Sequence, residues 1–253
     1  MIHVIVNADD FGINEVVTSE IERMILARHI SSTTIMANGM CLEEVKRFAL
    51  EHPTVSYGVH LCLSEFDSLT KSDGLYKARL TDEAGVFITN AVFSLKSLAD
   101  LEVKEAIKAE LNAQLEVAKG LGIPLSHADS HHHVHALNVL SDLFVEVLAK
   151  HSIKKMRRAP DFHTFRAKIH LLQWIRTNQL NRYYGSHFIQ TDDFYSVGRY
   201  IENGCPLKEG SVIELMCHPG HPGPYYRQEM QFVESAAISN LPNVQLISYN
   251  ELV

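Results

Sequence analysis

The chain has 253 residues, of which 46% are hydrophobic and 21% charged, a composition typical of a soluble globular protein. Its formal net charge is −7 and it has no long basic run, which argues against a nucleic-acid-binding protein. No apolar run approaches the roughly 20 residues of a membrane span, so no membrane partner is expected. The opening residues MIHVIVNADDFG become acidic where a secretory signal would stay apolar, which predicts a cytoplasmic protein.

Short apolar, β-branched runs alternate with segments of helical periodicity along the chain. The predicted strands are Ile2–Ala8, Thr33–Ala37, Val55–Leu61, Pro124–Asp129, Ile153–Met156, His187–Gln190, Val212–Cys217 and Val244–Ser248. Three predicted helices have clear apolar faces, formed by Ile13, Val17, Ile21, Met24 and Ile25, by Leu101, Ile107, Leu111, Leu115 and Ala118, and by Leu137, Leu140, Phe144, Val147 and Leu148. This alternation predicts an α/β protein with a mostly parallel sheet covered by helices.

Seven or eight such units predict a distorted (β/α) barrel, and a doubly wound open sheet is the alternative. The length suits one barrel, and no linker rich in Pro, Gly or Ser interrupts it, so residues 1–253 are expected to form a single domain. Ser64–Thr89 and Tyr183–Gly210 have weak periodicity and are expected to be irregular. They are either walls of a substrate cleft or ordinary surface loops.

The four cysteines, at positions 41, 62, 205 and 217, form no CxxC pair and are expected to be reduced. Cys217 lies at the end of a predicted strand and is interpreted as a buried core thiol rather than a nucleophile.

The first predicted strand ends in two adjacent carboxylates, Asp9 and Asp10, in the segment NADDFG. Neighbouring carboxylates at the end of an apolar run repel each other and lose hydration, so a compensating charge is needed. A metal ion can supply it, with one aspartate as ligand and the other as a base. The alternative is that one of them caps the helix expected to begin near Asn14.

Histidines follow two further strands. His60 lies in the run GVHL at the end of the third predicted strand, and taken alone it is more often a buried, hydrogen-bonded residue than a ligand. Five of the 15 histidines lie in the segment HADSHHHVH, residues 127–135, so a solvated polar loop is a weak explanation for it. In an extended segment Asp129 shares one face with His127 and His131, where it can be a ligand or can orient an imidazole.

Two more candidates follow later strands. His218 begins the turn HPGHP after the run ending in Cys217, whereas His221 is expected to face solvent. Arg158 follows the fifth predicted strand, where it suits a carboxylate partner or is a surface arginine.

The candidates Asp9, Asp10, His60, His131, Arg158 and His218 all follow predicted strands. Since the carboxyl ends of parallel strands gather at one face, where active sites lie, these side chains are expected to meet. One aspartate with two histidines leaves coordination positions open, which is typical of a catalytic metal site.

The segments NADDFG, STTIMANG, GVHL, HADSHHHVH, RAP and CHPG resemble those of the YdjC/ChbG-type carbohydrate deacetylases, from the first strand to about Gly220. The resemblance implies a distorted (β/α) barrel of the glycoside hydrolase/deacetylase type. It also implies an enzyme that removes acetyl groups from N-acetylglucosamine-containing oligosaccharides such as acetylated chitobiose. Beyond Gly220 the family varies, which leaves the roles of Tyr225 and Tyr226 open.

The same resemblance implies metal ligation by Asp10, His60 and His131, catalysis by Asp9 as base and His218 as acid, and orientation of Asp9 by Arg158. The implied metal is magnesium, whereas two imidazole ligands fit zinc or another transition ion better. Other histidines of the cluster, His127, His132 and His133, remain alternative ligands.

Three other functions remain open at this point: a metal-dependent ester or phosphoester hydrolase on the same barrel, a glycosidase with two carboxylates, and a non-catalytic metal-binding protein. The expected partner is a small acetylated sugar, and a homodimer is considered without a recognisable interface motif.

Overall fold

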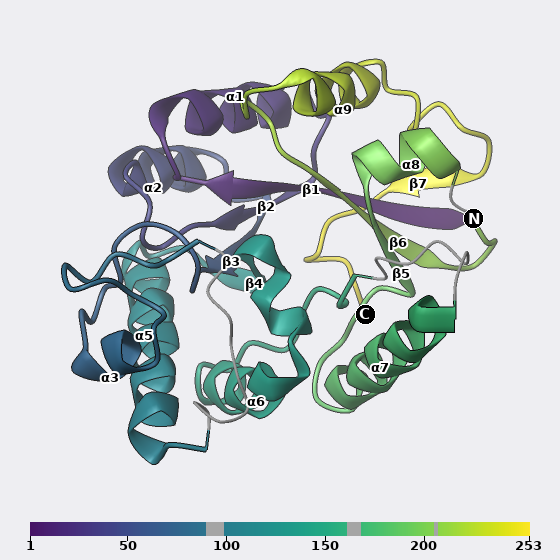
Figure 1. Ribbon diagram of the computed structural model, residues 1–253. Helices are drawn as coiled ribbons and strands as arrows, with labels where there is room; N and C mark the ends of the chain where they lie inside the picture. Colours follow the sequence, from purple (N-terminus) through teal and green to yellow (C-terminus); the bar gives the residue numbers. More distant parts are fainter. Residues whose placement is uncertain (90–98, 161–167, 205–206) are drawn as a thin grey trace.

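The computed structural model describes residues 1–89, 99–160, 168–204 and 207–253. It contains a curled sheet with helices around its outside (Figure 1). The strands are β1 (Ile2–Phe11), β2 (Ser32–Ile35), β3 (Ser56–Leu61), β4 (Leu125–Ser130), β5 (Asp193–Ser196), β6 (Val212–Cys217) and β7 (Val244–Leu246). The helices are α1 (Glu15–Leu26), α2 (Leu42–Glu51), α3 (Asp73–Lys77), α5 (Leu101–Gly120), α6 (Ser141–Lys150), α7 (Lys168–Gly185), α8 (Val197–Asn203) and α9 (Pro224–Glu234). Two 3₁₀ segments, η1 (His131–Ala136) and η2 (Asn138–Leu140), follow β4.

The strands are parallel and run in the order β4-β3-β2-β1-β6-β5, with β7 pairing the start of β1. Isolated parallel bridges extend the sheet beyond β4, from Ala128 to Met156 and from Lys155 to Ile189. Since Ile189 leads into β5, these bridges join the two edges of the sheet. The architecture is therefore the predicted distorted (β/α) barrel rather than an open sheet.

Most predicted strands are confirmed, and Val212–Cys217 has the predicted bounds. Ile153–Met156 and His187–Gln190 form isolated bridges, at Lys155, Met156 and Ile189, instead of full strands. The expectation that Tyr183–Gly210 is irregular is wrong: it holds the end of α7, β5 and α8, although residues 205–206 lie outside the described part. The short, half-buried β5 begins with an aspartate and lacks the apolar pattern that marks a strand.

Alternation along β1 separates two environments. Val4, Val6 and Ala8 point outwards and pack in the core beneath the surrounding helices. Ile5 points inwards and packs on the C-terminal residues Ile247, Tyr249 and Leu252, which form the floor of the barrel. Above this floor the interior is polar and fully buried, with the side chains of Asn7, Asp9, Thr34, His60, Asp129, Arg157 and Glu214. Barrel interiors are usually filled by branched apolar side chains, so this filling needs a functional reason.

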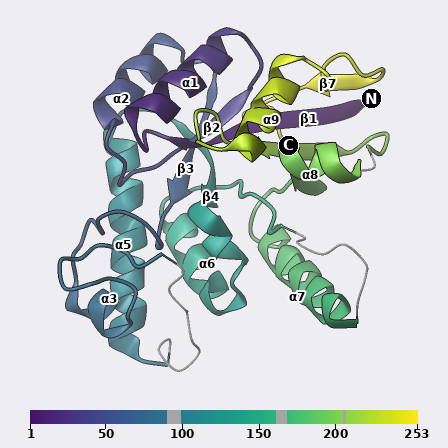
Figure 2. The same ribbon diagram turned by 45° about the horizontal axis from the view of Figure 1, so that its top comes forward.

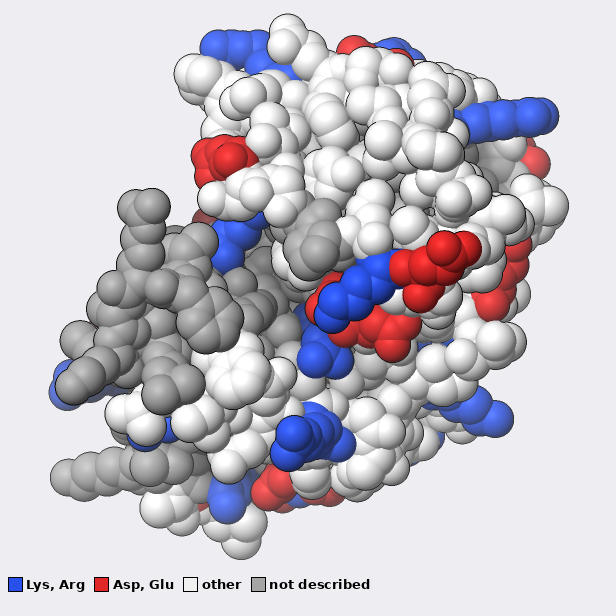
Figure 3. Space-filling view, turned by 90° about the vertical axis from the view of Figure 1, so that its right-hand side faces the viewer, with Lys and Arg blue, Asp and Glu red and all other residues white. Residues whose placement is uncertain are grey.

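The helices α1, α2 and α9 lie on one side of the strands, and α5, α6 and α7 lie on the other (Figure 2). The excursion after β3 contains α3 and packs on α5, whose buried Glu110 accepts hydrogen bonds from the backbone of Leu69 and Thr70. On the face shown in Figure 3, charged side chains of both signs stand among uncharged ones. Within the described residues, no helix combines the length and the apolar character that a membrane crossing needs.

Candidate active site

Three side chains of the kinds that can ligate a metal meet where β1, β3 and β4 end. Asp10 Oδ1 lies 3.1 Å from His60 Nε2 and 2.9 Å from His131 Nδ1, and the two imidazole nitrogens are 3.3 Å apart. All three side chains are buried. Donor atoms about 2.1 Å from one ion and at right angles to each other lie about 3.0 Å apart. The observed triangle therefore has the size of one face of a metal coordination sphere.

The two adjacent aspartates of β1 both reach this side because the backbone leaves the strand pattern at Asp10. Its φ is +71°, and the register of β1 against β2 shifts between Ala8 and Phe11. Such an irregularity re-aims a side chain, and aspartate tolerates the left-handed region better than most residues. Without it, Asp9 and Asp10 would point to opposite faces of the sheet.

Each of the three side chains of this triangle has a second polar partner that orients it. His60 Nδ1 lies 2.6 Å from Asp129 Oδ1, and His131 Nε2 lies 3.2 Å from Glu65 Oε2. The second carboxylate oxygen of Asp10 lies 3.0 Å from His221 Nε2. His221 thus turns into the site rather than facing solvent as expected. Carboxylates behind metal-ligating histidines fix the ring orientation and increase ligand basicity.

The local electrostatics favour a cation at this triangle. Burial alone would raise the pKa of Asp10, but hydrogen bonds from His131, His221 and His60 hold it well below its usual value. Burial alone would lower the pKa of His60, but the charge of Asp129 and bonds with Asp10 and Asp129 raise it well above its usual value. The lowered pKa keeps Asp10 ionised, and the raised pKa of His60 arises from the negative charges of Asp129 and Asp10, which a divalent cation can neutralise. The residues present therefore fit a divalent metal ion.

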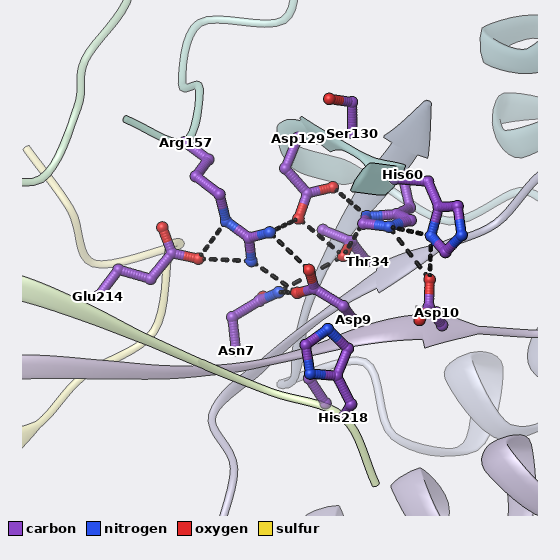
Figure 4. A network of polar contacts seen from close by, with 12 residues as sticks. Asn7, Asp9, Asp10, Thr34, His60, Asp129, Ser130, Arg157, Glu214 and His218 are labelled. Atoms are coloured by element: carbon purple, nitrogen blue, oxygen red, sulfur yellow. Dashed lines mark hydrogen bonds and ion pairs between the residues drawn. The ribbon is translucent and has the colours of Figure 1, made fainter. Parts of the chain in front are cut away.

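Asp9 is held by a different partner (Figure 4). Arg157 donates to both of its carboxylate oxygens at 2.6 Å, and Asn7 Nδ2 donates to Oδ1 at 2.9 Å. Burial alone would raise the pKa of Asp9, but the charge and hydrogen bonds of Arg157 lower it strongly. A carboxylate has about four acceptor positions. These three bonds, from described residues, leave one position on Oδ2.

The arginine that contacts Asp9 is thus Arg157, and the expectation that Arg158 performs this role is corrected. Lys155 and Arg157 are two positions apart in an extended segment, so both side chains lie on its inner face. There Lys155 Nζ donates to the Tyr249 carbonyl at 2.6 Å. Arg158 falls on the other face and is half-buried. Sequence reasoning identified the correct strand end but not which of two adjacent arginines points inwards.

Arg157 is completely buried and joins three carboxylates of the barrel interior. Besides Asp9, it binds Asp129 Oδ2 at 2.7 Å and Glu214 Oε1 at 2.8 Å. Its pKa rises well above the usual value because these charges outweigh the effect of burial. Since Asp129 also contacts His60, one guanidinium connects the candidate base with the triangle of Asp10, His60 and His131.

His218 follows β6 and lies beside Asp9 (Figure 4). Its Nδ1 is 3.3 Å from Glu229 Oε2, and its ring centroid is 5.5 Å from that of His221 and 5.2 Å from that of Tyr226. Burial alone would lower the pKa of His218, but Glu229, Asp9 and Asp10 raise it overall. The imidazolium form is therefore favoured next to the candidate base.

The remaining histidines of residues 127–135 have other environments. His127 is buried below the site and stacks on Tyr249, with ring centroids 3.6 Å apart, and burial lowers its pKa well below the usual value. His135 Nδ1 lies 2.6 Å from Ser130 Oγ, and burial lowers its pKa to about 3. The more exposed His132 bonds Ser64 at 3.0 Å and is the third member of a second potential metal-binding group, with Glu65 and His131.

Sequence reasoning missed Glu65, Arg157, Glu214 and Glu229. Glu214 had a usable signal, because it is the one charged residue within the apolar run VIELMC. Glu229 shares the buried face of α9 with Val233 at helical spacing, which is unusual for a carboxylate. Glu65 lies in a loop whose path only the fold reveals.

A comparison with protein-family models matches residues 3–243 to the YdjC-like protein family. Curated relatives along nearly the whole chain are named carbohydrate deacetylase. One from Brevibacillus brevis is 28% identical over 263 residues, covering 98% of each chain. One from Vibrio cholerae serotype O1 is 29% identical over 270 residues, covering 99% of this chain and 96% of the relative. A shorter match, to a carbohydrate deacetylase from Oceanobacillus iheyensis, is 34% identical over 149 residues and covers 56% of this chain and 59% of the relative.

Among solved structures, an Enterococcus faecalis protein described as a candidate cellobiose-phosphate cleavage protein superimposes with a TM-score of 0.74. The match covers 99% of this chain and 98% of that protein at 22% sequence identity. This likeness shows that the two chains share a fold.

Proposed function

Because the chain belongs to the YdjC-like protein family, we propose that it is a metal-dependent carbohydrate deacetylase that releases acetate from an N-acetylated sugar. It is an enzyme that hydrolyses an amide bond, as the names of its full-length relatives support. One observation carries the metal-dependent part of the proposal. The triangle of Asp10, His60 and His131 is buried next to a carboxylate, Asp9, and an imidazole, His218, with opposite pKa shifts.

The cation would be held by Asp10 Oδ1, His60 Nε2 and His131 Nδ1. When bound, it polarises the acetyl carbonyl and makes the attacking water more acidic, which a base of such low pKa as Asp9 requires. Two imidazole donors favour zinc or another transition ion over magnesium, which prefers oxygen ligands. We propose a divalent ion of this kind, with magnesium as the alternative that the family resemblance implies.

The protein's own side chains divide the proton transfers between them. Asp9 is ionised at every working pH, and its remaining Oδ2 position accepts the proton of the attacking water. His218, favoured as imidazolium, donates a proton to the departing sugar amine. Arg157 keeps Asp9 oriented and ionised. The sugar is proposed to be an N-acetylglucosamine-containing oligosaccharide such as acetylated chitobiose.

A phosphoester hydrolase on the same barrel is less compatible with this arrangement. Phosphate recognition needs available cationic donors. The guanidinium of Arg157, which contacts the candidate base, is already bound by the carboxylates of Asp9, Asp129 and Glu214.

The test is acetate release from N,N′-diacetylchitobiose, with fully deacetylated chitobiose as the blank, before and after treatment with a chelator. We expect activity that is lost on chelation and restored by a divalent ion. Metal analysis of His60→Ala and His131→Ala should show metal loss from folded protein, whereas the control His132→Ala should keep its metal. Metal retained in His60→Ala but lost in both His131→Ala and His132→Ala would move the site to Glu65, His131 and His132.

The remaining sequence expectations are part of the same proposal. We propose that residues 1–253 form one cytoplasmic domain that is active as a monomer or a homodimer. Cys41, Cys62 and Cys217 are buried free thiols, which suits a reducing compartment. Sedimentation at assay concentration distinguishes the two oligomeric states.

A further inference from the structure

The buried carboxylate of Glu229, next to His218, has no role in this mechanism. Glu229 lies on α9 and is completely buried. Its Oε1 accepts a hydrogen bond from the backbone N–H of Gly198 at 3.1 Å, and the Tyr225 hydroxyl also bonds it. Its Oε2 lies 3.3 Å from His218 Nδ1. Among the ion pairs of the described residues, the basic partner of Glu229 is His218.

A buried carboxylate is unfavourable unless a positive charge and hydrogen bonds compensate it. Two neutral donors, from Gly198 and Tyr225, hold the position of Glu229, and its ion-pair partner His218 can provide the charge. The pair therefore stabilises the imidazolium and the carboxylate reciprocally.

The contact also decides which nitrogen of His218 is available. Because Nδ1–H is donated to Glu229, Nε2 is the atom that carries the transferable proton. The other groups facing the ring are Asp9 and Asp10 from β1, His221 from the following loop and Tyr226 from α9. The contact at 3.3 Å between Glu229 Oε2 and Nδ1 is separate from these neighbours.

We propose that Glu229 is a positioning residue that binds His218 Nδ1, fixes the orientation of the ring and directs Nε2 towards the leaving amine. This inference rests on the proposed function, since it assigns His218 the role of general acid. It places one part of the catalytic machinery on α9, beyond the segments that carry the family resemblance.

The competing explanation is structural, because the Gly198 N–H lies in the first turn of α8 and Glu229 could simply bind that turn. Glu229→Gln separates the two, since the amide oxygen can still accept from Gly198 while the negative charge is lost. The matched control is Glu234→Gln, the same change on the same helix at a more exposed carboxylate paired with Arg23.

The direct measurement is an NMR titration of His218 in the metal-loaded protein, which needs no substrate. In Glu229→Gln we expect the pKa of His218 to fall by about one unit, while Glu234→Gln leaves it unchanged. With N,N′-diacetylchitobiose, kcat should fall on the order of 10–100-fold with little change in KM, and the alkaline limb of the pH profile should move to lower pH. Glu229→Asp keeps the charge and should recover part of both effects.

An unchanged His218 titration and an unchanged alkaline limb in folded Glu229→Gln would overturn the proposal and leave Glu229 as a structural residue. If that variant does not fold, Glu229→Asp decides by the same titration, because a shorter carboxylate should weaken the pairing. Failure of the wild-type protein to release acetate would contradict the proposed function instead, and the titration would still report whether Glu229 controls His218.

Discussion

Adjacent, chemically identical residues acquire different properties from their partners. Asp9 has both oxygens bound by Arg157, whereas Asp10 is surrounded by three imidazoles, those of His60, His131 and His221. The hydrogen bonds from the guanidinium keep Asp9 ionised, so that it can accept a proton. Asp10 instead lies next to imidazoles that could bind a metal ion together with it. The left-handed backbone at Asp10 makes this division possible, because it brings both carboxylates to one side.

The first prediction separates these two roles. Asp9→Asn should keep the metal and lose on the order of 10²–10⁴ in kcat, because an amide cannot accept the proton of the attacking water. Asp10→Asn should instead lose metal affinity, since it removes the only anionic donor of the triangle. Metal analysis together with acetate release tests both. If Asp9→Asn loses the metal and Asp10→Asn keeps it, the two roles are reversed.

The second prediction concerns the two consecutive arginines. Arg157→Met should lower the free energy of unfolding by about 3–5 kcal/mol at pH 7, because three buried carboxylates lose their counter-charge. Arg158→Met, on the other face, should change it by less than about 0.5 kcal/mol. Arg157→Lys should be intermediate, since lysine keeps the charge but not the paired donors. Urea denaturation measures all three, and similar losses at the two positions would contradict the assignment of the inward face.

At the scale of elements, close packing between β3 and β4 supports the site from below. The ring of His127 on β4 lies against the backbone of Gly58 on β3, where a Cβ would be only 2.6 Å from the imidazole. The His127 ring cannot move away from Gly58, because it stacks on the ring of Tyr249 on its other side. Two residues further along β3 is His60, so the strand that carries this ligand has little freedom to shift.

The third prediction uses this contact. Gly58→Ala should destabilise the protein by about 1–3 kcal/mol through overpacking and should weaken metal binding, because β3 must move. The control is Gly120→Ala, at the end of α5, where a new Cβ meets nothing within 4 Å. There alanine should be neutral or stabilise the helix by up to about 1 kcal/mol. Thermal unfolding with and without chelator tests the pair, and equal stability of the two variants would show that His127 adapts.

At the scale of the molecule, the barrel interior connects the C-terminal residues with the site. The Tyr249 hydroxyl donates to Glu214 Oε2 at 2.5 Å, and Glu214 in turn binds Arg157. A chain of polar contacts thus runs from the floor of the barrel to Asp9 at its upper end. Burial raises the pKa of Glu214 to about 7, although Arg157 and Tyr249 partly oppose the shift.

The fourth prediction is a pH dependence of stability that this carboxyl group causes. Because the pKa of Glu214 is higher in the folded protein than its ordinary value of 4.5, the group favours folding when protonated. That contribution is complete below about pH 4.5 and is lost as the pH rises through about 7. The pKa of Asp9 is lowered instead, so its contribution is lost only in acid, below this window.

Glu214→Gln imitates the protonated form at every pH. Its free energy of unfolding should therefore fall less than that of the wild type between pH 5 and 8, by on the order of 2–3 kcal/mol. Urea denaturation at intervals of one pH unit measures the difference, with Glu234→Gln as a surface control. Parallel curves for the wild type and Glu214→Gln would exclude Glu214 as the titrating group.

The sequence alone was sufficient to predict the architecture. It was also sufficient to predict at which strand ends the candidate site residues lie. Apolar periodicity is a local property, so most strands and helices could be predicted from it, and parallel strands place their carboxyl ends together whatever their order. For this reason Asp10, His60 and His131, which are far apart in the chain, could be expected to meet. The structure brings them within 3.3 Å of one another.

Only the tertiary structure decided how these residues are paired. The choice of Arg157 over Arg158 depends on which alternate residues face inwards, and a shift of one residue reverses it. The bulge at Asp10 depends on the register against β2. The contacts of Glu65 with His131 and of Glu229 with His218 join segments whose separation in the sequence carries no periodic signal. Such long-range contacts determine charge, orientation and pKa, because these depend on the distances between side chains, which no local pattern of residues encodes.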